Sequence, residues 1–307
     1  MHENKAKPMK ILITGAGGFV GKKLTYYLAE NGHRVIAAVH STPPIKDKRH
    51  FSSPNVDILE LDLTSLDCGQ LPSDINVIYT LAQSVNFREF PEKAEDVFAV
   101  NIAANFKLWQ WAVQSGVRKC IHISSGGIYG GEYRKVFHEN ELLAIGSPLG
   151  FYLSSKLCSE IIFLNYNEFF ETTIILRPFF IYGPGQRRDM FISRLIELVK
   201  KGQSLQLQGK QGLRVNPVYV DDAVIAFANA SNLNGFHIIN VAGPDVLNLR
   251  QVGETIGQAL GKKPVFEMLD ETPVDYIANT EQAARKLNQP MTSFTKGIIW
   301  TIAGNET

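Results

Sequence analysis

Short apolar runs alternate with longer amphipathic segments over the first half of the chain. The runs are ILIT, VIAAV, VDILEL, VIYTLA, CIHIS and TTIILR, and helical periodicity fills stretches between them such as 91–114 and 152–169. Apolar runs of this length are typical of parallel strands that are covered on both faces, and parallel strands need crossover connections. The pattern therefore predicts an α/β fold, a doubly wound parallel sheet with helices on both faces.

The alternation of apolar runs and amphipathic segments ends after Arg177. Prolines and glycines lead into a predicted helix over 190–201, and a predominantly helical tail begins at Leu249. Between these two, the segments VYVDDAVIAFANA and FHIINVAG resemble the first part of the chain again. We expect a first domain over 1–177 with a returning segment at about 216–245, and a smaller, discontinuous C-terminal domain, 178–215 with 246–307, that covers the substrate.

A glycine-rich loop, GAGGFVG, follows the first apolar run and precedes a helical segment. In such a unit one glycine allows the tight turn, and another lets backbone N–H groups approach a pyrophosphate. A further glycine lets the helix pack closely on the sheet. The spacing is GxxGxxG, yet the strand before it and the helix after it favour a dinucleotide site over a plain turn. The candidate cofactor positions in this loop are Gly15, Gly17, Gly18, Phe19 and Val20.

A tyrosine and a lysine lie four residues apart, Tyr152 and Lys156 in YLSSK, and Ser125 ends a strand in ISSGGIYG. Free tyrosine keeps its proton until about pH 10, so it is a weak base unless its phenolate is stabilised. On a helix, the ammonium of Lys156 lies on the same face one turn on and favours the charged oxygen. A serine at the carboxyl edge of a parallel sheet adds a hydrogen bond to a substrate oxygen. These residues predict hydride transfer between an alcohol or ketone and a dinucleotide.

The end of the second strand is where an acidic side chain would bind the ribose hydroxyls of the adenosine. This chain has His40 and Ser41 there, and the cations Lys46, Lys48 and Arg49 follow. A 2′-phosphate would be repelled by a carboxylate and bound by such groups, so the missing acid favours NADP over NAD. The alternative is that His40 merely ends a strand and that the lysines belong to a solvated loop.

Two residues after the third strand are also placed near the adenosine. Asp62 and Leu63 are expected to meet the adenine ring. Asp62 fits equally well as the cap of a short helix that begins at Thr64.

Composition excludes several classes of function. The 307 residues are 45% hydrophobic, and 31 basic against 30 acidic residues give a net charge of +1, so no single-sign field would bind nucleic acid or an anionic membrane. Cys68, Cys120 and Cys158 are odd in number and far apart, so neither disulfides nor a metal site is expected. The polar N-terminus has no signal-peptide character, and no apolar run approaches the ~20 residues of a membrane span. We expect a cytoplasmic protein.

These motifs resemble those of the extended short-chain dehydrogenase/reductases of the NAD-dependent epimerase/dehydratase family. The likeness runs from Lys10 to about Gly297. The segments that carry it are GAGGFVG, Asp62-Leu63, TLAQ at 80–83, VNIAAN with Asn101, ISSGGIYG, YLSSK, LRPFFIYGPGQ at 176–186, VYVDDA at 218–223 and LNLRQVGETIGQALGK at 247–262. The resemblance implies a Rossmann-type sheet and a substrate that is a nucleoside-diphosphate sugar.

The resemblance also implies roles for individual residues. By the family pattern Ser125, Tyr152 and Lys156 are catalytic, and Asn101 supports the lysine through a structural water. The residues that would flank the nicotinamide are Leu81, Ala82, Gln83, Ile123, Ser124, Tyr152, Lys156, Pro178, Phe179 and Ile181. The candidate substrate contacts are Ser84, Gly126, Phe180, Arg187 and Arg214.

Departures from the family pattern narrow the reaction. The dehydratase branch has an Asp-Glu pair after the catalytic hydroxyl, where this chain has Gly126 and Gly127. The branch that epimerises two carbons before a reduction has a cysteine directly after the serine. Both reactions are therefore disfavoured. Phe180 replaces the usual asparagine before the YGP motif, so the substrate contact there is expected to be apolar or through backbone, and Thr80 replaces the histidine of the HLAA motif.

The resemblance implies an NAD(P)-dependent nucleotide-sugar epimerase that acts by transient oxidation at C4. Three alternatives stay open: an NADPH-dependent reductase of nucleotide 4-keto sugars, a reductase of a non-sugar carbonyl compound, and a regulatory protein that senses a dinucleotide. The intact Ser-Tyr-Lys set argues against the regulator. The missing ribose-binding acid fits a reductase, whereas the family favours an epimerase.

Two surface features bear on partners. The guanidinium fork of Arg187, Arg188 or Arg214 matches the oxygens of a diphosphate, although exposed arginine pairs more often face solvent. Dimers in this family pair the helix that contains Asn101 with the helix that contains Tyr152. The apolar residues that permit a homodimer of this kind are Phe106, Leu157, Ile161 and Leu164.

Overall fold

The computed structural model describes residues 8–41, 49–130, 135–141, 143 and 150–305. The chain divides into two compact units, each built from separate stretches of sequence. Unit 1 consists of Met1–Ser124, Gly150–Leu176 and Phe227–His237, and unit 2 of Ser125–Leu149, Arg177–Ala226 and Ile238–Thr307. This division assigns 125–149 to unit 2, and the domain boundaries expected from sequence stay a prediction.

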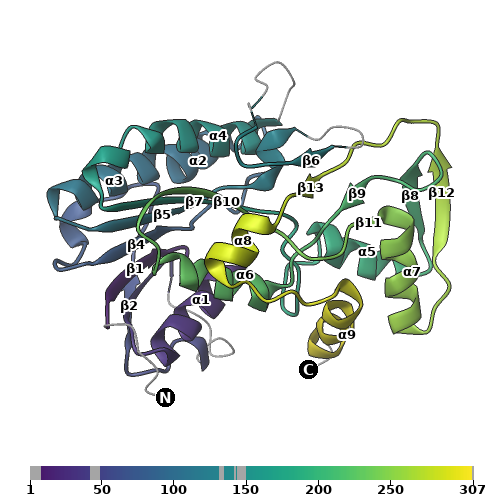
Figure 1. Ribbon diagram of the computed structural model, residues 1–307, viewed down its shortest axis with the longest axis horizontal. Helices are drawn as coiled ribbons and strands as arrows, with labels where there is room; N and C mark the ends of the chain where they lie inside the picture. Colours follow the sequence, from purple (N-terminus) through teal and green to yellow (C-terminus); the bar gives the residue numbers. More distant parts are fainter. Residues whose placement is uncertain (1–7, 42–48, 131–134, 142, 144–149, 306–307) are drawn as a thin grey trace. The chain divides into compact units, whose positions relative to one another are not determined.

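A seven-stranded sheet has the order β10-β7-β5-β4-β1-β2-β3 (Figure 1). Its strands are β1 (Lys10–Thr14), β2 (Arg34–Val39), β3 (Val56–Glu60), β4 (Val77–Thr80), β5 (Lys119–Ile123), β7 (Thr172–Pro178) and β10 (Gly235–Val241). Strands β1 to β5 and β7 pair in parallel, and Leu12 of β1 lies between Ile36 of β2 and Ile78 of β4. The predicted parallel α/β sheet is therefore confirmed.

Helices cover the part of this sheet that belongs to unit 1. In Figure 1, α3 and α4 lie on one side of the strands and α1 on the other. Fully buried Trp109 of α3 packs on Phe163 of α4, with ring centroids 4.7 Å apart. The helical elements here are α1 (Phe19–Glu30), α2 (Ala94–Phe98), the π-helical turn η3 (Ala99–Ala103), α3 (Ala104–Gln114), α4 (Gly150–Leu164) and the 3-10 turns η2 (Cys68–Gln70) and η5 (Asn167–Phe169).

The predicted single helix over 91–114 begins later in the structure, at Ala94, and is interrupted by a π-helical turn. The π-helical turn η3 separates α2 from α3 and contains Asn101, whose side chain is fully buried. A π turn inserts an extra residue into the helix, and such turns are frequent at functional sites. The π turn thus directs the side chain of Asn101 into the interior of unit 1.

The described residues of unit 2 form three small two-stranded sheets. These are the pairs β8 (Ser204–Gln208) with β12 (Val265–Leu269), β9 (Arg214–Val215) with β11 (Leu247–Asn248), and β6 (Val136–Phe137) with β13 (Ile277–Ala278). Its helices are α5 (Phe191–Lys200), α7 (Leu249–Leu260), α8 (Glu281–Leu287), α9 (Phe294–Asn305) and the 3-10 turn η4 (Gly126–Tyr129), and α6 (Val220–Ala230) continues from it into unit 1.

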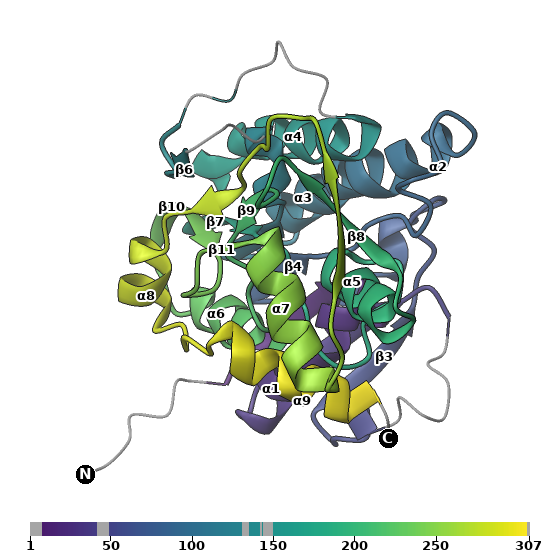
Figure 2. The same ribbon diagram turned by 90° about the vertical axis from the view of Figure 1, so that its right-hand side faces the viewer.

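Helix α7 shows how local sequence sets its ends. A capping box of Asn248 and Gln251 begins it, and Gly261 ends it in the left-handed conformation. It packs against α5 and α9, beside the β8 and β12 pair (Figure 2). Strand β12 interrupts the tail that the sequence pattern predicted as helical. Among the described residues, none of the helices has the length and apolar character needed to cross a bilayer.

Candidate active site

The glycine loop connects β1 to α1. Gly15 has φ of +73°, and a Cβ there would lie 2.7 Å from Cα of Ala82, so both the turn and the approach of the next loop require glycine. A Cβ at Gly21 would collide with the carbonyl oxygen of Gly15. These two glycines are therefore explained by contacts within the protein.

Gly17 has a different surrounding. A Cβ there would meet only the side chain of Val39, at an ordinary 3.5 Å, so protein packing does not require glycine. The helix that follows begins at Phe19, its N-cap Gly18 provides no side-chain hydrogen bond, and its first turn holds no acidic residue. Open space beside N–H groups at a helix N-terminus suits a pyrophosphate. The loop therefore fits a dinucleotide.

The adenosine positions lie at the ends of β2 and β3. His40 and Ser41 are exposed. Asp62 accepts hydrogen bonds from N and Oγ1 of Thr64 at 2.8 and 2.7 Å, and so caps its own turn. The Thr64 hydroxyl bond is the main reason that the pKa of the Asp62 carboxyl is lowered, and the charge of His40 contributes. Leu63 is half-buried, and Lys46 and Lys48 lie outside the described residues.

Helix α4 carries the tyrosine and the lysine. The phenol of Tyr152 donates to Oε1 of Gln83 at 3.0 Å, and its ring packs on Phe87 with centroids 4.9 Å apart. Lys156 is 2% exposed, and its Nζ donates to the carbonyl oxygen of Ile123 at 2.8 Å. Burial lowers the pKa of Lys156 to about 8, and the buried carboxylate of Glu160 opposes this shift. The ammonium is thus fixed one helical turn from the phenol.

Asn101 ties this helix to the loop after β4. Its Nδ2 donates to Oγ of Ser155 at 2.9 Å, and that hydroxyl donates to the carbonyl oxygen of Tyr152 at 2.7 Å. Its Oδ1 accepts from N of Ser84 at 2.9 Å. The hydroxyl of Ser84, a candidate substrate contact, donates to Asp96 of α2. In this structure Ser84 and Asn101 therefore hold the backbone around Tyr152.

The strand ends that would flank a nicotinamide are also held in place. Leu81 and Ala82 donate from their backbone N to Oγ1 of Thr14 at 3.3 and 3.4 Å. Ser124 follows β5, and its N donates to the carbonyl oxygen of Leu176 at 2.8 Å. Its hydroxyl is buried and has no hydrogen-bond partner among the described residues. An unsatisfied buried hydroxyl costs about 1–3 kcal/mol, so this position suits a polar group of a ligand.

Ser125 begins the 3-10 turn η4 in unit 2. Its Oγ accepts from N of Gly127 at 3.2 Å and so caps that turn. The next residue, Gly126, has no room for a side chain, because a Cβ there would lie 2.5 Å from Cζ of Phe179 and closer to two other ring carbons. The packing of Phe179 thus explains why this chain has a glycine, and no catalytic side chain, at position 126.

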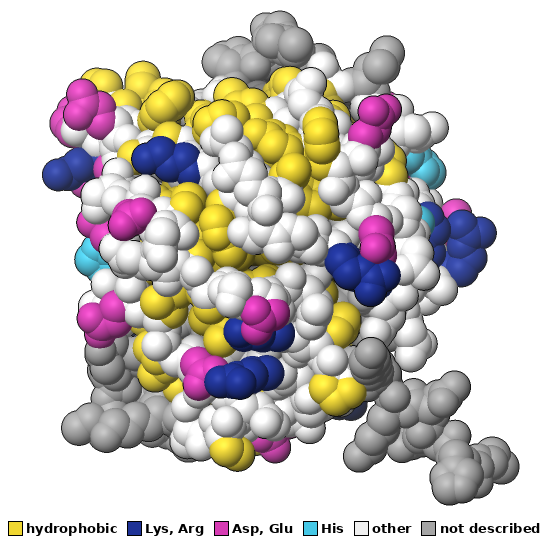
Figure 3. Space-filling view, turned by 90° about the vertical axis from the view of Figure 1, so that its left-hand side faces the viewer, with side chains coloured by type: hydrophobic (Ala, Val, Ile, Leu, Met, Phe, Trp, Pro, Cys, Tyr) yellow, Lys and Arg dark blue, Asp and Glu magenta, His cyan; other side chains and the backbone are white. Residues whose placement is uncertain are grey.

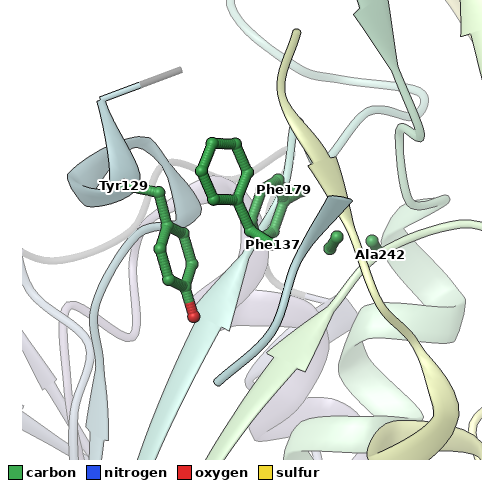
Figure 4. Close-up of a cluster of buried hydrophobic side chains, with 5 residues drawn as sticks. Tyr129, Phe137, Phe179 and Ala242 are labelled. Atoms are coloured by element: carbon green, nitrogen blue, oxygen red, sulfur yellow. The ribbon is translucent and has the colours of Figure 1, made fainter. Parts of the chain in front are cut away.

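Phe179 belongs to a buried cluster in unit 2. Tyr129 stacks on Phe137 and Phe179, with centroids 4.9 and 6.0 Å away (Figure 4). Ala242 and Ala278 complete the cluster. The hydroxyl of Tyr129 accepts from the buried guanidinium of Arg177 at 2.7 Å and donates to Asn240 at 2.9 Å. The turn after Ser125 is therefore fixed by both apolar packing and hydrogen bonds.

Phe180 has an unusual backbone conformation. Its φ is +45°, which is rare for a bulky side chain, and such strain is commonly found at functional sites. Its ring meets Phe191 and Tyr276, with centroids 5.0 and 5.9 Å away. The preceding Pro178 and the following Ile181 are half-buried.

The candidate diphosphate arginines differ in their surroundings. Nη2 and Nε of Arg214 donate to Oδ2 of Asp275 at 2.6 and 2.9 Å, and Asp275 is almost fully buried. Arg187 is exposed and pairs with Asp189 at 2.9 Å. Exposed Arg188 lies 3.9 Å from Glu197. Of these three arginines, Arg214 is the one that a buried carboxylate holds in place.

The candidate residues thus fall into two groups. Unit 1 brings together Tyr152, Lys156 and Asn101 with Gln83, and it also holds the glycine loop. Unit 2 holds Ser125, Gly126, Phe179, Phe180, Arg187 and Arg214. Four residues that contact these candidates were not predicted from the sequence: Ser155, Asp96, Glu160 and Asp275. Ser155 and Glu160 had a signal, since they lie on the same helix as Tyr152 and Lys156, whereas Asp275 lies 61 residues from Arg214 and had none.

Comparison with known proteins decides the family. A model of the NAD dependent epimerase/dehydratase family matches residues 11–242. The chain belongs to this family. It is 25% identical over 309 residues to a UDP-glucuronate 4-epimerase of Thermodesulfobacterium geofontis, covering 95% of this chain and 94% of the relative. It is 26% identical over 311 residues to a UDP-glucose 4-epimerase of Mycolicibacterium smegmatis, covering 96% and 97%.

A solved structure extends the likeness to the fold. A UDP-glucuronic acid 4-epimerase from Bacillus cereus, in complex with UDP-glucuronic acid and NAD, superposes with a TM-score of 0.83 at 26% identity, over 97% of this chain and 99% of that one. The expected family, fold and enzyme class are confirmed. This epimerase/dehydratase family member is an enzyme that uses a nicotinamide dinucleotide.

Proposed function

We propose that this enzyme inverts the configuration at C4 of a UDP-sugar, with NAD as its cofactor. The observation that carries the proposal is the Tyr152 phenol and the buried Lys156 ammonium one turn apart on α4, beside a glycine loop that fits a dinucleotide. Similar proteins that are UDP-sugar 4-epimerases support the substrate class. They favour the epimerase over the reductases and the regulator.

The residues of this chain would supply the proton chemistry. The phenolate of Tyr152 takes the proton of the C4 hydroxyl and returns it after inversion. The ammonium of Lys156, held on the carbonyl of Ile123, stabilises that phenolate. The family pattern implies that Ser125, the second residue after β5, donates a hydrogen bond to a sugar oxygen. NAD, when bound, supplies reversible hydride transfer at C4.

The choice of NAD rests on solved relatives that contain it. The absence of an acid at the end of β2 had favoured NADP, but Asp62 supplies an exposed carboxylate after the adjacent strand β3, close enough to His40 for their charges to interact. A carboxylate there disfavours a 2′-phosphate. Titration of the purified protein with NAD and NADP should give at least about tenfold tighter binding of NAD. Equal or tighter binding of NADP would contradict this choice and favour NADP as the cofactor.

Arg214 is the side chain that we propose for the diphosphate. Asp275 fixes its guanidinium, and its side chain remains 39% exposed. A fixed, partly exposed guanidinium matches phosphate oxygens at little entropic cost. Replacing Arg214 with lysine should raise KM for the UDP-sugar about tenfold. Arg187→Lys is the matched control, because that arginine pairs on the surface with Asp189.

The deciding experiment tests interconversion directly. The enzyme is incubated with NAD and either UDP-glucuronate or UDP-glucose, and the 4-epimers are separated by chromatography. We expect interconversion without net change in NAD, lost in the variant Tyr152→Phe. Stoichiometric oxidation of NADPH by a nucleotide 4-keto sugar, without interconversion, would instead establish the reductase. Activity that survives in Tyr152→Phe would refute the assignment of the site.

We also infer a homodimer that forms through unit 1. Phe106 of α3 and Ile161 and Leu164 of α4 are 43%, 50% and 41% exposed, whereas Leu157 is buried within the unit. Figure 3 shows hydrophobic side chains gathered in the upper part of the face that it draws. Sedimentation should show a dimer that Ile161→Glu converts to a monomer. Ile299→Glu, an equally exposed position on α9 of unit 2, is the control. A monomeric wild type would refute the inference.

A further inference from the structure

The side chain of Gln83 contacts the oxygen on which the proposed proton transfer depends. The Tyr152 phenol donates to Oε1 of Gln83 at 3.0 Å. The resemblance places Gln83 beside the nicotinamide, in the TLAQ segment that corresponds to the HLAA motif, where the family has alanine. Its side-chain amide therefore has no assigned role.

The backbone of Gln83 is fixed on both sides, although its side chain is exposed. The preceding Ala82 is buried, bonds from its N to Oγ1 of Thr14 and lies directly against Gly15. The following Ser84 is held at its N by Asn101 and at its hydroxyl by Asp96. The loop thus presents the Gln83 side chain to Tyr152 from a rigid support, which is what a residue that acts on a reacting atom requires.

The amide group suits both protonation states of a phenol. Its oxygen accepts from the neutral phenol, and after a half-turn of the amide its Nε2 donates to the phenolate. When the sugar hydroxyl loses its proton, an O–H bond breaks on the sugar and another forms on Tyr152. The negative charge passes from the tyrosine to the sugar oxygen, and the return step reverses this. An alanine could make neither hydrogen bond.

We propose that Gln83 is a catalytic residue of this enzyme, which holds the Tyr152 oxygen by accepting from the phenol and donating to the phenolate. The inference rests on the proposed function, in which Tyr152 moves the proton. The charged residues on its own helix are Lys156 and Glu160. Asp96 lies on α2, which packs against that helix, and Arg88 lies over the ring of Phe87, which packs on Tyr152. His122 of β5 interacts electrostatically with Lys156.

Two variants separate hydrogen bonding from shape and charge. Gln83→Met keeps the length of the side chain but makes no hydrogen bond to the phenol, and kcat should fall about tenfold with KM unchanged. Gln83→Glu places a carboxylate beside the phenolate, so the acid limb of the kcat profile should move to higher pH by about one unit. Gln70→Glu adds the same charge at an exposed site on the 3-10 turn η2 and should leave the profile unchanged.

The outcomes are distinct. A kcat within about twofold of wild type for both Gln83 variants would overturn the proposal, as would a change confined to KM. A second readout needs no turnover: tyrosinate absorbance is titrated in each variant with Tyr152→Phe as the blank. If the tyrosinate titration of Gln83→Glu shifts to higher pH, the contact between residue 83 and Tyr152 is supported even where the epimerase assignment fails. An unchanged titration refutes that contact.

Discussion

Replacing Gly126 with alanine would drive a methyl group into the ring of Phe179. A Cβ built at Gly126 lies 2.5 Å from Cζ and closer to Cδ2 and Cε2 of that ring, whereas ordinary contacts begin at 3.4 Å. The ring would have to retreat by roughly 1 Å, although it is 2% exposed and already packed on Tyr129. Overpacking of this kind costs about 1–3 kcal/mol, so we expect Gly126→Ala to lose this much unfolding free energy.

Denaturant unfolding of both proteins measures this loss. Gly17→Ala is the matched control, because its Cβ would meet only Val39 at 3.5 Å, and its unfolding free energy should change by less than about 0.5 kcal/mol. Phe179→Leu in the Gly126→Ala background should recover part of the loss and give a non-additive double-mutant cycle. A Gly126→Ala protein as stable as wild type, or strict additivity, would show that the ring does not fill this space.

Three further predictions concern buried titratable groups. Burial lowers the pKa of Lys156 from 10.5 to about 8, so the unfolded chain binds more protons between these values. Stability should therefore rise with pH in that window, and the slope should be absent in denaturant titrations of Lys156→Met. Burial also lowers the pKa of His122 well below 6.5, so stability should fall as pH drops below about 6.5, and His122→Asn should remove that loss in acid titrations. Asp275→Asn should cost about 1–3 kcal/mol of unfolding free energy, less than a fully buried pair because Arg214 is 39% exposed, and Asp189→Asn on the surface should cost less than about 1 kcal/mol.

Strands such as β1, β4 and β7 could be predicted because they are buried over most of their length, whereas β3 is largely exposed. In β1 and β4 nearly every residue is covered, so the apolar run marks the strand without any knowledge of its neighbours. The positions of Tyr152 and Lys156 were equally accessible, since four residues make one turn of a helix. Local rules thus sufficed for the fold and for the central pair of the site.

Non-local contacts account for what the sequence could not reveal. Strand β12 pairs with β8, some 60 residues away, and most of its residues are exposed, so VFEML carries no clear strand pattern. The π-helical turn around Asn101 depends on its bonds to Ser84 and Ser155. The link of Arg214 to Asp275 likewise spans 61 residues. Each of these features follows from tertiary packing, which overrides local propensity.

The structure gives different reasons for glycine at positions 126 and 17, which the sequence alone could not distinguish. Gly126 is glycine because Phe179 occupies the space of a side chain, which also leaves no place for the acid or thiol of related reactions. At Gly17 a Cβ would meet the side chain of Val39 at an ordinary 3.5 Å, so packing among the described residues does not require glycine there. A position with room for a side chain at the N-terminus of a helix suits a ligand that approaches the backbone. Gly126 therefore fits the proposed reaction, which uses the serine, tyrosine and lysine, and Gly17 fits the position that we propose for the dinucleotide.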